Sequence, residues 1–220
     1  MIPADGLLFD CDGVLVDSDD AAAQAWNSWA ADYAPGFNFA RDITHGRPAG
    51  DTVAELVPPR DVARATQALM DLEIDTAPMV RALPGAAELL HSLPKGSWTV
   101  VTSAVRAVAR ARLGAAGLPC PVDIVTAQDV HRGKPAPDPY RIGAERLGIA
   151  PVCGVVFEDA EAGVRSALAA GIGLTIGVGE RGLGTQARLV VADLRDIRFN
   201  GTELDLRRAH ILRQPDPAYE

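Results

Sequence analysis

The spacing of apolar residues divides the chain into a helical first part and a mixed second part. Residues 7–9 form an uninterrupted apolar run, typical of a strand buried on both faces, which ends at Asp10. From residue 17 to residue 83, apolar positions instead recur at helical spacing, as in Ala22, Trp26 and Trp29. Helices are expected from about residue 18, around 51–57 and over about 61–80, with residues 17–19 capping the first and no strand in this part.

After residue 85, short apolar runs alternate with helical stretches. This alternation predicts an α/β fold in which a parallel sheet carries helices on both faces. Residues 202–220 are polar and are expected to be partly helical or frayed. The expected strands lie at 98–102, 123–126, 155–157, 173–178 and 189–191, and the expected helices at 86–92, at 105–116, from 138 onward and at 161–170.

Composition and charge exclude several classes of function. The chain has 220 residues, and its formal net charge of -8 argues against nonspecific nucleic-acid binding, which requires a basic surface. No apolar run approaches the roughly 18 residues of a membrane span, and no signal peptide is visible. The three cysteines lack paired or zinc-ligand spacing, which fits a reducing compartment. We therefore expect a cytoplasmic protein that binds neither nucleic acid nor a membrane.

Polar side chains follow the ends of several predicted strands. Because the carboxyl ends of parallel strands meet at one edge of a sheet, these side chains are expected to converge. Asp10 and Asp12 are carboxylates only two residues apart, and they repel each other if both are buried. A metal ion, a phosphate-binding environment or protonation of one acid would offset this repulsion. The alternative is a solvated turn that ends the strand. The converging residues are Asp10, Asp12, Ser103, Lys134, Glu158 and Asp159.

This set of side chains suits phosphoryl transfer. Asp10, Asp12 and Asp159 offer the oxygen ligands that Mg²⁺ prefers. Ser103 and Lys134 can hold a phosphoryl oxygen. Asp10 would then be the nucleophile and form an aspartyl phosphate. Asp12 would donate a proton to the leaving oxygen and later take one from water.

Four segments together resemble the motifs of the haloacid dehalogenase superfamily. They occur in that family's order, and the resemblance extends from residue 7 to residue 171. It implies a Rossmann-like core of residues 1–16 and 84–220, with residues 17–83 inserted as an α-helical cap. The segments are DCDGVLVDS at 10–18, VTS at 101–103, GKPAPD at 133–138 and FEDAEAG at 157–163.

The resemblance also implies a cofactor and a role for each site residue. The expected cofactor is Mg²⁺, and the expected metal ligands are Asp10, the carbonyl oxygen of Asp12, and Asp159, with Glu158 nearby. The expected catalytic residues are Asp10 and Asp12, and the expected phosphate-binding residues are Ser103, Ala104 and Lys134.

Differences within the superfamily indicate a phosphatase. Dehalogenases lack a counterpart of Asp12, and phosphonatases use a cap lysine, which residues 17–83 do not contain. Beta-phosphoglucomutases have a cap histidine where residues 19–22 here read DDAA. The chain is similar to phosphatases of small sugar and polyol phosphates, so the expected partner is a small phosphorylated metabolite. A sugar-phosphate mutase and an inert phospho-metabolite-binding protein remain as alternatives; a monomer is expected, with a dimer left open.

Several further residues receive weaker interpretations. His45 and Arg47 of the predicted cap are hypothesised to face the substrate, with the cap surface as the alternative. The predicted helix at 105–116 carries Arg106, Arg110 and Arg112, which are expected mainly on a solvated face, with Arg106 as an alternative contact of the phosphate site. The GxGxxG match at 177–182 is expected to be a loop at the rim of the sheet, and Cys11 is expected in the core.

Overall fold

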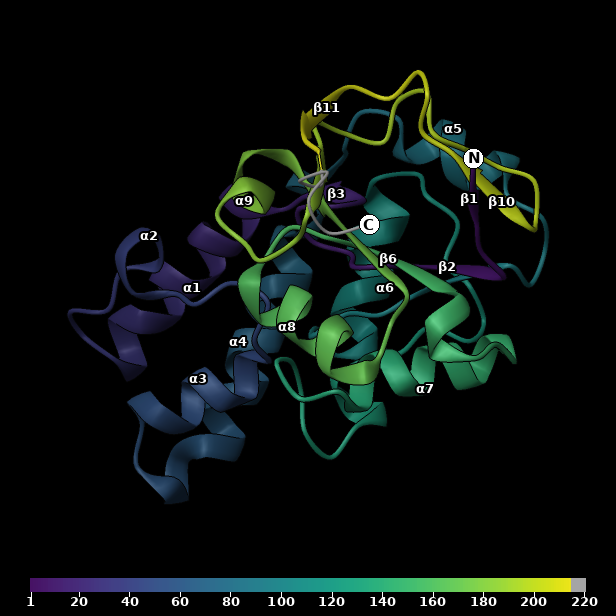
Figure 1. Ribbon diagram of the computed structural model, residues 1–220. Coiled ribbons are helices and arrows are strands. Elements are labelled where there is room, and N and C mark those ends of the chain that lie inside the picture. The colour runs from purple at the N-terminus through teal and green to yellow at the C-terminus, as the bar shows by residue number, and fades with distance from the viewer. Residues whose placement is uncertain (215–220) are drawn as a thin grey trace.

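A six-stranded, mostly parallel sheet forms the centre of the larger part of the molecule (Figure 1). The computed structural model describes residues 1–214. Strand β2 runs parallel to β5 and β6, and β7 runs parallel to β6 and β8, while β11 closes one edge antiparallel to β8. The expected α/β class is thereby confirmed. The order across the sheet is β11 (Ile211–Arg213), β8 (Leu189–Val191), β7 (Leu174–Val178), β6 (Gly154–Glu158), β2 (Gly6–Phe9) and β5 (Trp98–Val100).

Helices cover both faces of the sheet, and successive side chains of strand β2 point to opposite faces and contact different helices. Leu7 and Phe9 pack in one buried cluster with residues of α5 and α6, whereas Leu8 packs in another with residues of α7 and α8. Cys11 belongs to the first cluster, as expected. These helices and the shorter ones beside them are α5 (Ala86–Ser92), α6 (Arg106–Ala115), η3 (Ala127–Asp129), α7 (Asp138–Leu147), η4 (Pro151–Cys153), α8 (Glu161–Ala170) and α9 (Gly179–Leu183).

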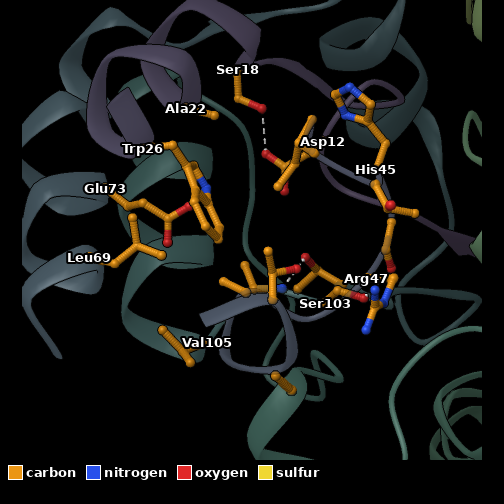
Figure 2. A pocket seen from close by; sticks show the side chains of 18 of the residues that line it. Asp12, Ser18, Ala22, Trp26, His45, Arg47, Leu69, Glu73, Ser103 and Val105 are labelled. Carbon is orange, nitrogen blue, oxygen red and sulfur yellow. Dashed lines mark hydrogen bonds between the residues drawn. The ribbon is translucent and has the colours of Figure 1, made fainter. Parts of the chain in front are cut away.

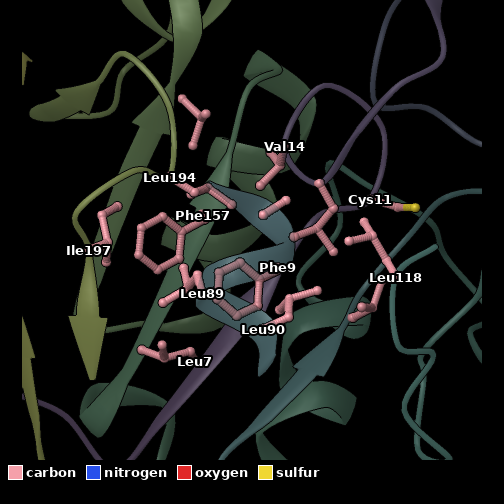
Figure 3. Close-up of a cluster of buried hydrophobic side chains, with 14 of the residues drawn as sticks. Leu7, Phe9, Cys11, Val14, Leu89, Leu90, Leu118, Phe157, Leu194 and Ile197 are labelled. Atoms are coloured by element: carbon pink, nitrogen blue, oxygen red, sulfur yellow. The ribbon is translucent and has the colours of Figure 1, made fainter. Parts of the chain in front are cut away.

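Two stacked phenyl rings join the neighbouring strands β2 and β6. Phe9 of β2 and Phe157 of β6 are partners in the parallel register, and their ring centroids lie 5.0 Å apart with nearly parallel planes. Leu89 and Leu90 of α5 line the same cluster (Figure 3). The register also sets Asp10 beside Glu158 at the carboxyl ends of these strands.

The segment between residues 19 and 79 is helical and has a hydrophobic cluster of its own, which includes Trp26, Trp29, Phe39 and Leu69. The Trp29 indole donates a hydrogen bond to the carbonyl of Ala65 at 2.9 Å, which ties α1 to α4. These helices lie to one side of the sheet (Figure 1). In residues 1–214, no helix is both long and apolar enough to cross a membrane. The elements are α1 (Asp19–Tyr33), α2 (Phe39–Asp42), α3 (Ala49–Leu56), η1 (Pro59–Asp61), α4 (Val62–Thr76) and η2 (Ala77–Met79).

The two crossings between the helical segment and the rest of the chain lie side by side. Strand β3 (Val16–Asp17) pairs antiparallel with β4 (Arg81–Ala82). The expectation of no strand within 17–83 is wrong at these ends, because pairs this short leave no periodic pattern in the sequence. The division into a core of 1–16 and 84–220 and a cap of 17–83 stays a prediction, and this ribbon coincides with its proposed boundaries.

Two other sequence-based expectations are wrong. Residues 123–126 form a single bridge, between Val101 and Val125, because Thr126 and Asp129 close a capping box and turn the chain into η3. The polar tail is extended where helix or fraying was expected: β10 (Glu203–Asp205) pairs with β1 (Ile2–Pro3) and β9 (Arg198–Phe199), and β11 joins the main sheet. Residues 215–220 of that expectation lie outside the described part.

Phe157→Ala tests the stacked pair. Removing a fully buried ring leaves a cavity between β2 and β6, and a Phe→Ala change of this kind costs about 3–5 kcal/mol of the free energy of unfolding. Urea denaturation measures it. The matched control is Leu168→Ala on α8, a side chain that is 49% exposed, which we expect to change stability by less than about 0.5 kcal/mol. Equal effects of the two substitutions would contradict this packing.

Candidate active site

The polar residues at the strand ends line one cavity beneath the helical segment. Asp10, Asp12, Ser103 and Asp159 enter it from the sheet side. Figure 2 shows Asp12 above this space and Ser103 below it, with Trp26, Leu69 and Glu73 of α1 and α4 to the left. The convergence expected from the sequence is therefore present.

Lys134 lies behind this cavity in an almost completely buried position, with a side chain that is 1% exposed. Its ammonium group donates hydrogen bonds to Asp10 Oδ1 at 2.9 Å, to Glu158 Oε1 at 2.6 Å and to the carbonyl of Val101 at 2.9 Å. All three protons of the ammonium group thus have an acceptor. Burial disfavours the charged form, but the carboxylates of Asp10 and Glu158 outweigh burial and raise the pKa of Lys134.

Both oxygens of Glu158 are already occupied by protein donors. Oε1 accepts hydrogen bonds from Lys134 and from the Tyr140 hydroxyl, at 2.6 and 2.9 Å. Oε2 accepts from the backbone N–H groups of Asp159 and Ala160. Gly163 permits this packing, because a β-carbon there would lie 1.6 Å from Glu158 Oε1. Glu158 is therefore suited to hold Lys134 and the following turn rather than to bind a ligand.

Three buried carboxylates could hold a metal ion: oxygens of Asp10, Glu158 and Asp159 lie within 4.8 Å of one another. Burial raises the pKa of Asp10 to about 7 and also raises that of Asp159, so a nearby cation would favour their charged forms. Since Glu158 is satisfied, Asp10 and Asp159 are the carboxylates best able to serve as ligands. Hard oxygen donors of this kind suit a divalent cation such as Mg²⁺.

Asp12 follows the strand in a turn that only glycine can complete. Gly13 has φ of +80°, and a β-carbon on it would lie 2.1 Å from Asp159 Oδ2. The Asp12 carboxylate accepts hydrogen bonds on Oδ1 from Ser18 Oγ at 2.6 Å and from Arg112 Nη1 at 2.9 Å. Ser18, one of the residues 17–19 expected to cap α1, is its N-cap residue, but its hydroxyl donates to Asp12 and makes no capping hydrogen bond.

The chain is similar to known proteins over most of its length. The sequence model of the haloacid dehalogenase-like hydrolase family matches residues 4–171. The chain belongs to this family. Hexitol phosphatase A of Escherichia coli is 44% identical over 171 residues, which span 76% of this chain and 79% of that protein. A beta-phosphoglucomutase of Mycobacterium tuberculosis is 38% identical over 85 residues, 34% of this chain and 32% of that protein. The crystal structure of a hydrolase from Pseudomonas syringae superposes with a TM-score of 0.73 at 25% identity, covering 87% of this chain and 94% of that one.

These similarities confirm the family expected from the four segments and the expectation of an enzyme of the phosphoric monoester hydrolase type. They also agree with the α/β sheet described above. The similarities assign no role to individual residues of this haloacid dehalogenase-like hydrolase, so we infer these roles from the geometry and chemistry of the site.

Two loops approach each other over the site. Ser103 Oγ donates a hydrogen bond to the carbonyl of Gly46, at 2.7 Å, which ties the loop after β5 to the helical segment. The N–H of Ala104 donates to Thr102 Oγ1 at 3.1 Å. Ser103 and Ala104 both line the cavity. Their phosphate-binding role stays a prediction.

His45 and Arg47 also line the cavity, from the loop around Gly46. The His45 ring packs edge-on against Phe39, and burial together with the charge of Arg181 lowers its pKa. Arg47 forms an ion pair with Glu55 at 2.7 Å within the helical segment. Both residues thus border the space that a substrate would use, and their contact with substrate stays a prediction.

Three charged residues of the site were missed by sequence reasoning. Arg112 was expected on a solvated face but is buried. Arg106, by contrast, pairs with Asp129 and does not line the cavity, so the alternative role of Arg106 at the phosphate site is not supported. The signal for Arg112 was its position among apolar residues of α6 spaced three and four apart. Glu73 binds Arg112 from α4.

Arg181 is the third missed residue, and it lies in the GxGxxG segment that was expected to be a loop. Residues 177–178 of this segment instead end strand β7, and residues 179–182 lie in the short helix α9. Arg181 Nε lies 2.7 Å from Asp159 Oδ2, and its Nη1 binds Asp19 of α1. No periodicity in the sequence links Arg181 to Asp159 or to Asp19.

Lys134→Met tests the buried cation. Loss of the ammonium group leaves Asp10 and Glu158 facing each other in a site shielded from water, and breaking a buried ion pair in this way costs about 3–5 kcal/mol. We expect a loss of this size in the free energy of unfolding from urea denaturation at neutral pH. Lys95→Met is the control, because Lys95 is the other lysine of the chain and is exposed. A stability unchanged by Lys134→Met would disprove the role of Lys134 as the counterion of these acids.

Proposed function

We propose that this chain is a Mg²⁺-dependent phosphatase that hydrolyses a small sugar or polyol phosphate through an aspartyl phosphate on Asp10. The observation that carries this proposal is the buried set of Asp10, Lys134, Glu158 and Asp159, with Asp12 two residues further along the same strand end. The similarity to hexitol phosphatase A supports a polyol phosphate as the substrate class. Phosphoryl transfer depends mainly on alignment and charge neutralisation, which this set offers.

In the first step, a carboxylate oxygen of Asp10 attacks phosphorus while the bond between phosphorus and the ester oxygen breaks. Lys134 Nζ, bound to Asp10 Oδ1, holds the nucleophile in orientation. Asp12 donates a proton to the departing oxygen, so that the leaving group departs as an alcohol. The Ser103 hydroxyl and the Ala104 N–H line the cavity and would hold the phosphoryl oxygens in place of their present acceptors, the Gly46 carbonyl and Thr102 Oγ1.

In the second step, Asp12 takes a proton from a water molecule whose oxygen attacks phosphorus. The acyl phosphate bond to Asp10 breaks, which releases inorganic phosphate and restores the carboxylate. Asp10, the carbonyl oxygen of Asp12, and Asp159 would hold Mg²⁺, whose charge would offset that of the phosphoryl oxygens. Glu158 keeps Lys134 in place through both steps.

A sugar-phosphate mutase is the alternative from the same family. The position where such mutases have a cap histidine corresponds here to the start of α1, where Asp19 pairs with Arg181 and Ala22 lines the cavity. Alanine carries no acid–base group, the Asp19 carboxylate is held in its ion pair with Arg181, and no imidazole stands in this part of α1. This argues for hydrolysis over isomerisation.

We also propose a cytoplasmic location and a monomeric state. The three cysteines, Cys11, Cys120 and Cys153, are free, and Cys120 is exposed. An exposed free thiol fits a reducing compartment.

The phosphatase is tested by phosphate release from a panel of esters with Mg²⁺. We expect turnover of hexitol, hexose and glycerol phosphates, abolished by Asp10→Asn because an amide cannot form the acyl phosphate. Asp71→Asn, on the exposed face of α4, is the control and should retain activity. Conversion of beta-glucose 1-phosphate to glucose 6-phosphate without phosphate release would instead establish the mutase. Binding of these esters without any reaction would indicate an inert binding protein.

Arg47→Ala tests the proposed substrate contact from the cap. A guanidinium that holds the substrate should raise KM for the preferred ester, whereas kcat changes less. His45→Ala should act in the same direction. Glu55→Ala, which frees Arg47 from its ion pair without removing it, is the control. If Arg47→Ala leaves KM unchanged for every ester in the panel, Arg47 does not face the substrate.

A further inference from the structure

The guanidinium of Arg112 joins the cap and the core at the edge of the active site. It projects from α6 of the core, and its side chain is 7% exposed. Nη1 lies 2.9 Å from Asp12 Oδ1, and Nη2 lies 2.9 Å from Glu73 Oε1. Glu73 belongs to α4 in the proposed cap, and its side chain is 11% exposed. The result is a continuous, nearly buried chain of carboxylate, guanidinium and carboxylate that ends on Asp12.

A role in stability alone explains this arrangement poorly. Removing an arginine and a glutamate from water costs free energy that their attraction recovers only in part, so buried ion pairs add little net stability. Arg112 is also incompletely satisfied, because its buried Nε has no hydrogen-bond partner in the described residues. Burial also disfavours the charged form of Glu73, and it raises the pKa of Glu73 despite the opposing charge of Arg112.

The geometry at Asp12 shows what the pair can do. Both donors to this carboxylate, Arg112 and Ser18, bind the same oxygen, Oδ1. Two donors on one oxygen fix the rotation of a short side chain and leave Oδ2 without a partner in the described part of the chain. Asp12 lines the cavity, so this second oxygen is available to a substrate there. A planar guanidinium with two bound carboxylates holds such an orientation better than a lysine, which acts as a point charge.

We propose that Arg112 is a positioning residue for Asp12, and that Glu73 holds Arg112 in place when the cap is packed against the core. This inference rests on the proposed function, in which Asp12 protonates the leaving oxygen. Because Glu73 and Arg112 lie on opposite sides of the boundary between cap and core, their ion pair ties the orientation of Asp12 to the packing of α4 on α6. Both residues also line the cavity, so direct contact with the substrate is the competing role that the experiment has to separate.

The leaving group provides the decisive readout. An alkyl ester needs a proton on its departing oxygen, whereas p-nitrophenyl phosphate releases a stable phenolate without one. The value of kcat/KM covers the steps from substrate binding to departure of the leaving group, so the difference between alkyl and aryl esters isolates the proton donation. The experiment compares kcat/KM for glycerol 3-phosphate, a hexitol phosphate and p-nitrophenyl phosphate in the unaltered protein and its variants, with Mg²⁺.

We expect Arg112→Lys to lower kcat/KM for the alkyl esters by about 10²-fold, the lower end of the range for general acid catalysis, and that for p-nitrophenyl phosphate only a few-fold. Glu73→Gln keeps the shape of the side chain and removes its charge. It should also lower kcat/KM more for the alkyl esters than for p-nitrophenyl phosphate, by a smaller factor than Arg112→Lys. Asp12→Asn serves as the reference for complete loss of the acid. Arg106→Lys on α6 and Asp71→Asn on α4 are the matched controls, and thermal denaturation verifies that each variant is folded.

The outcomes separate this proposal from the proposed function. If Asp12→Asn shows the selective loss and neither Arg112→Lys nor Glu73→Gln does, the positioning role is wrong and the role of Asp12 stands. Equal losses for alkyl and aryl esters in the Arg112 and Glu73 variants, or an increase in KM alone, would also overturn it, since those results indicate a structural or substrate-binding role. If Asp12→Asn itself shows no selectivity, the proposed function fails at Asp12, and the positioning role fails with it. Should Arg112→Lys not fold, Glu73→Gln decides.

Discussion

The buried ammonium group of Lys134 is the interaction on which the active-site edge depends. Its three acceptors come from the ends of three neighbouring strands: Asp10 after β2, the Val101 carbonyl after β5, and Glu158 at the end of β6. One cation therefore ties together the carboxyl ends of the central sheet. The orientation of Asp10 follows from this contact, and the turn at residues 158–160 follows from the second oxygen of Glu158.

The same network is the basis for the proposed binding of a divalent cation together with a phosphorylated ligand. Asp10, Glu158 and Asp159 place three carboxyl groups in one buried space, while Lys134 and Arg181 are the cations in contact with them. Burial raises the pKa of Asp10 and Asp159, so these two acids lack full compensation within the protein. A divalent cation would supply the missing charge and would in turn attract a phosphate ester.

The sequence predicted most of the sheet and the residues at its edge, because buried strands leave apolar runs and the residues after them are polar. It failed where position depends on contacts between distant segments. Arg112 shares its helix with Arg106, yet only the fold determines that one faces Asp12 and the other Asp129. Glu73 and Arg181 come from elements that no periodicity relates to the strand ends. The strand expected at 123–126 was lost to the capping box at Thr126, and the charged pattern of 203–213 concealed two short strands.

In the proposed mechanism, Asp10 carries the phosphoryl group during turnover. Trapping the phosphoryl group on Asp10 tests this role most directly. The protein is mixed with Mg²⁺ and a phosphate ester that it turns over, and the reaction is quenched in acid within one turnover. The protein is then reduced with borohydride and analysed by peptide mass spectrometry. Reduction of an acyl phosphate converts the aspartate to homoserine, and we expect this change at residue 10 and not at residue 12. Turnover without modification of Asp10, or modification at another carboxylate, would contradict it.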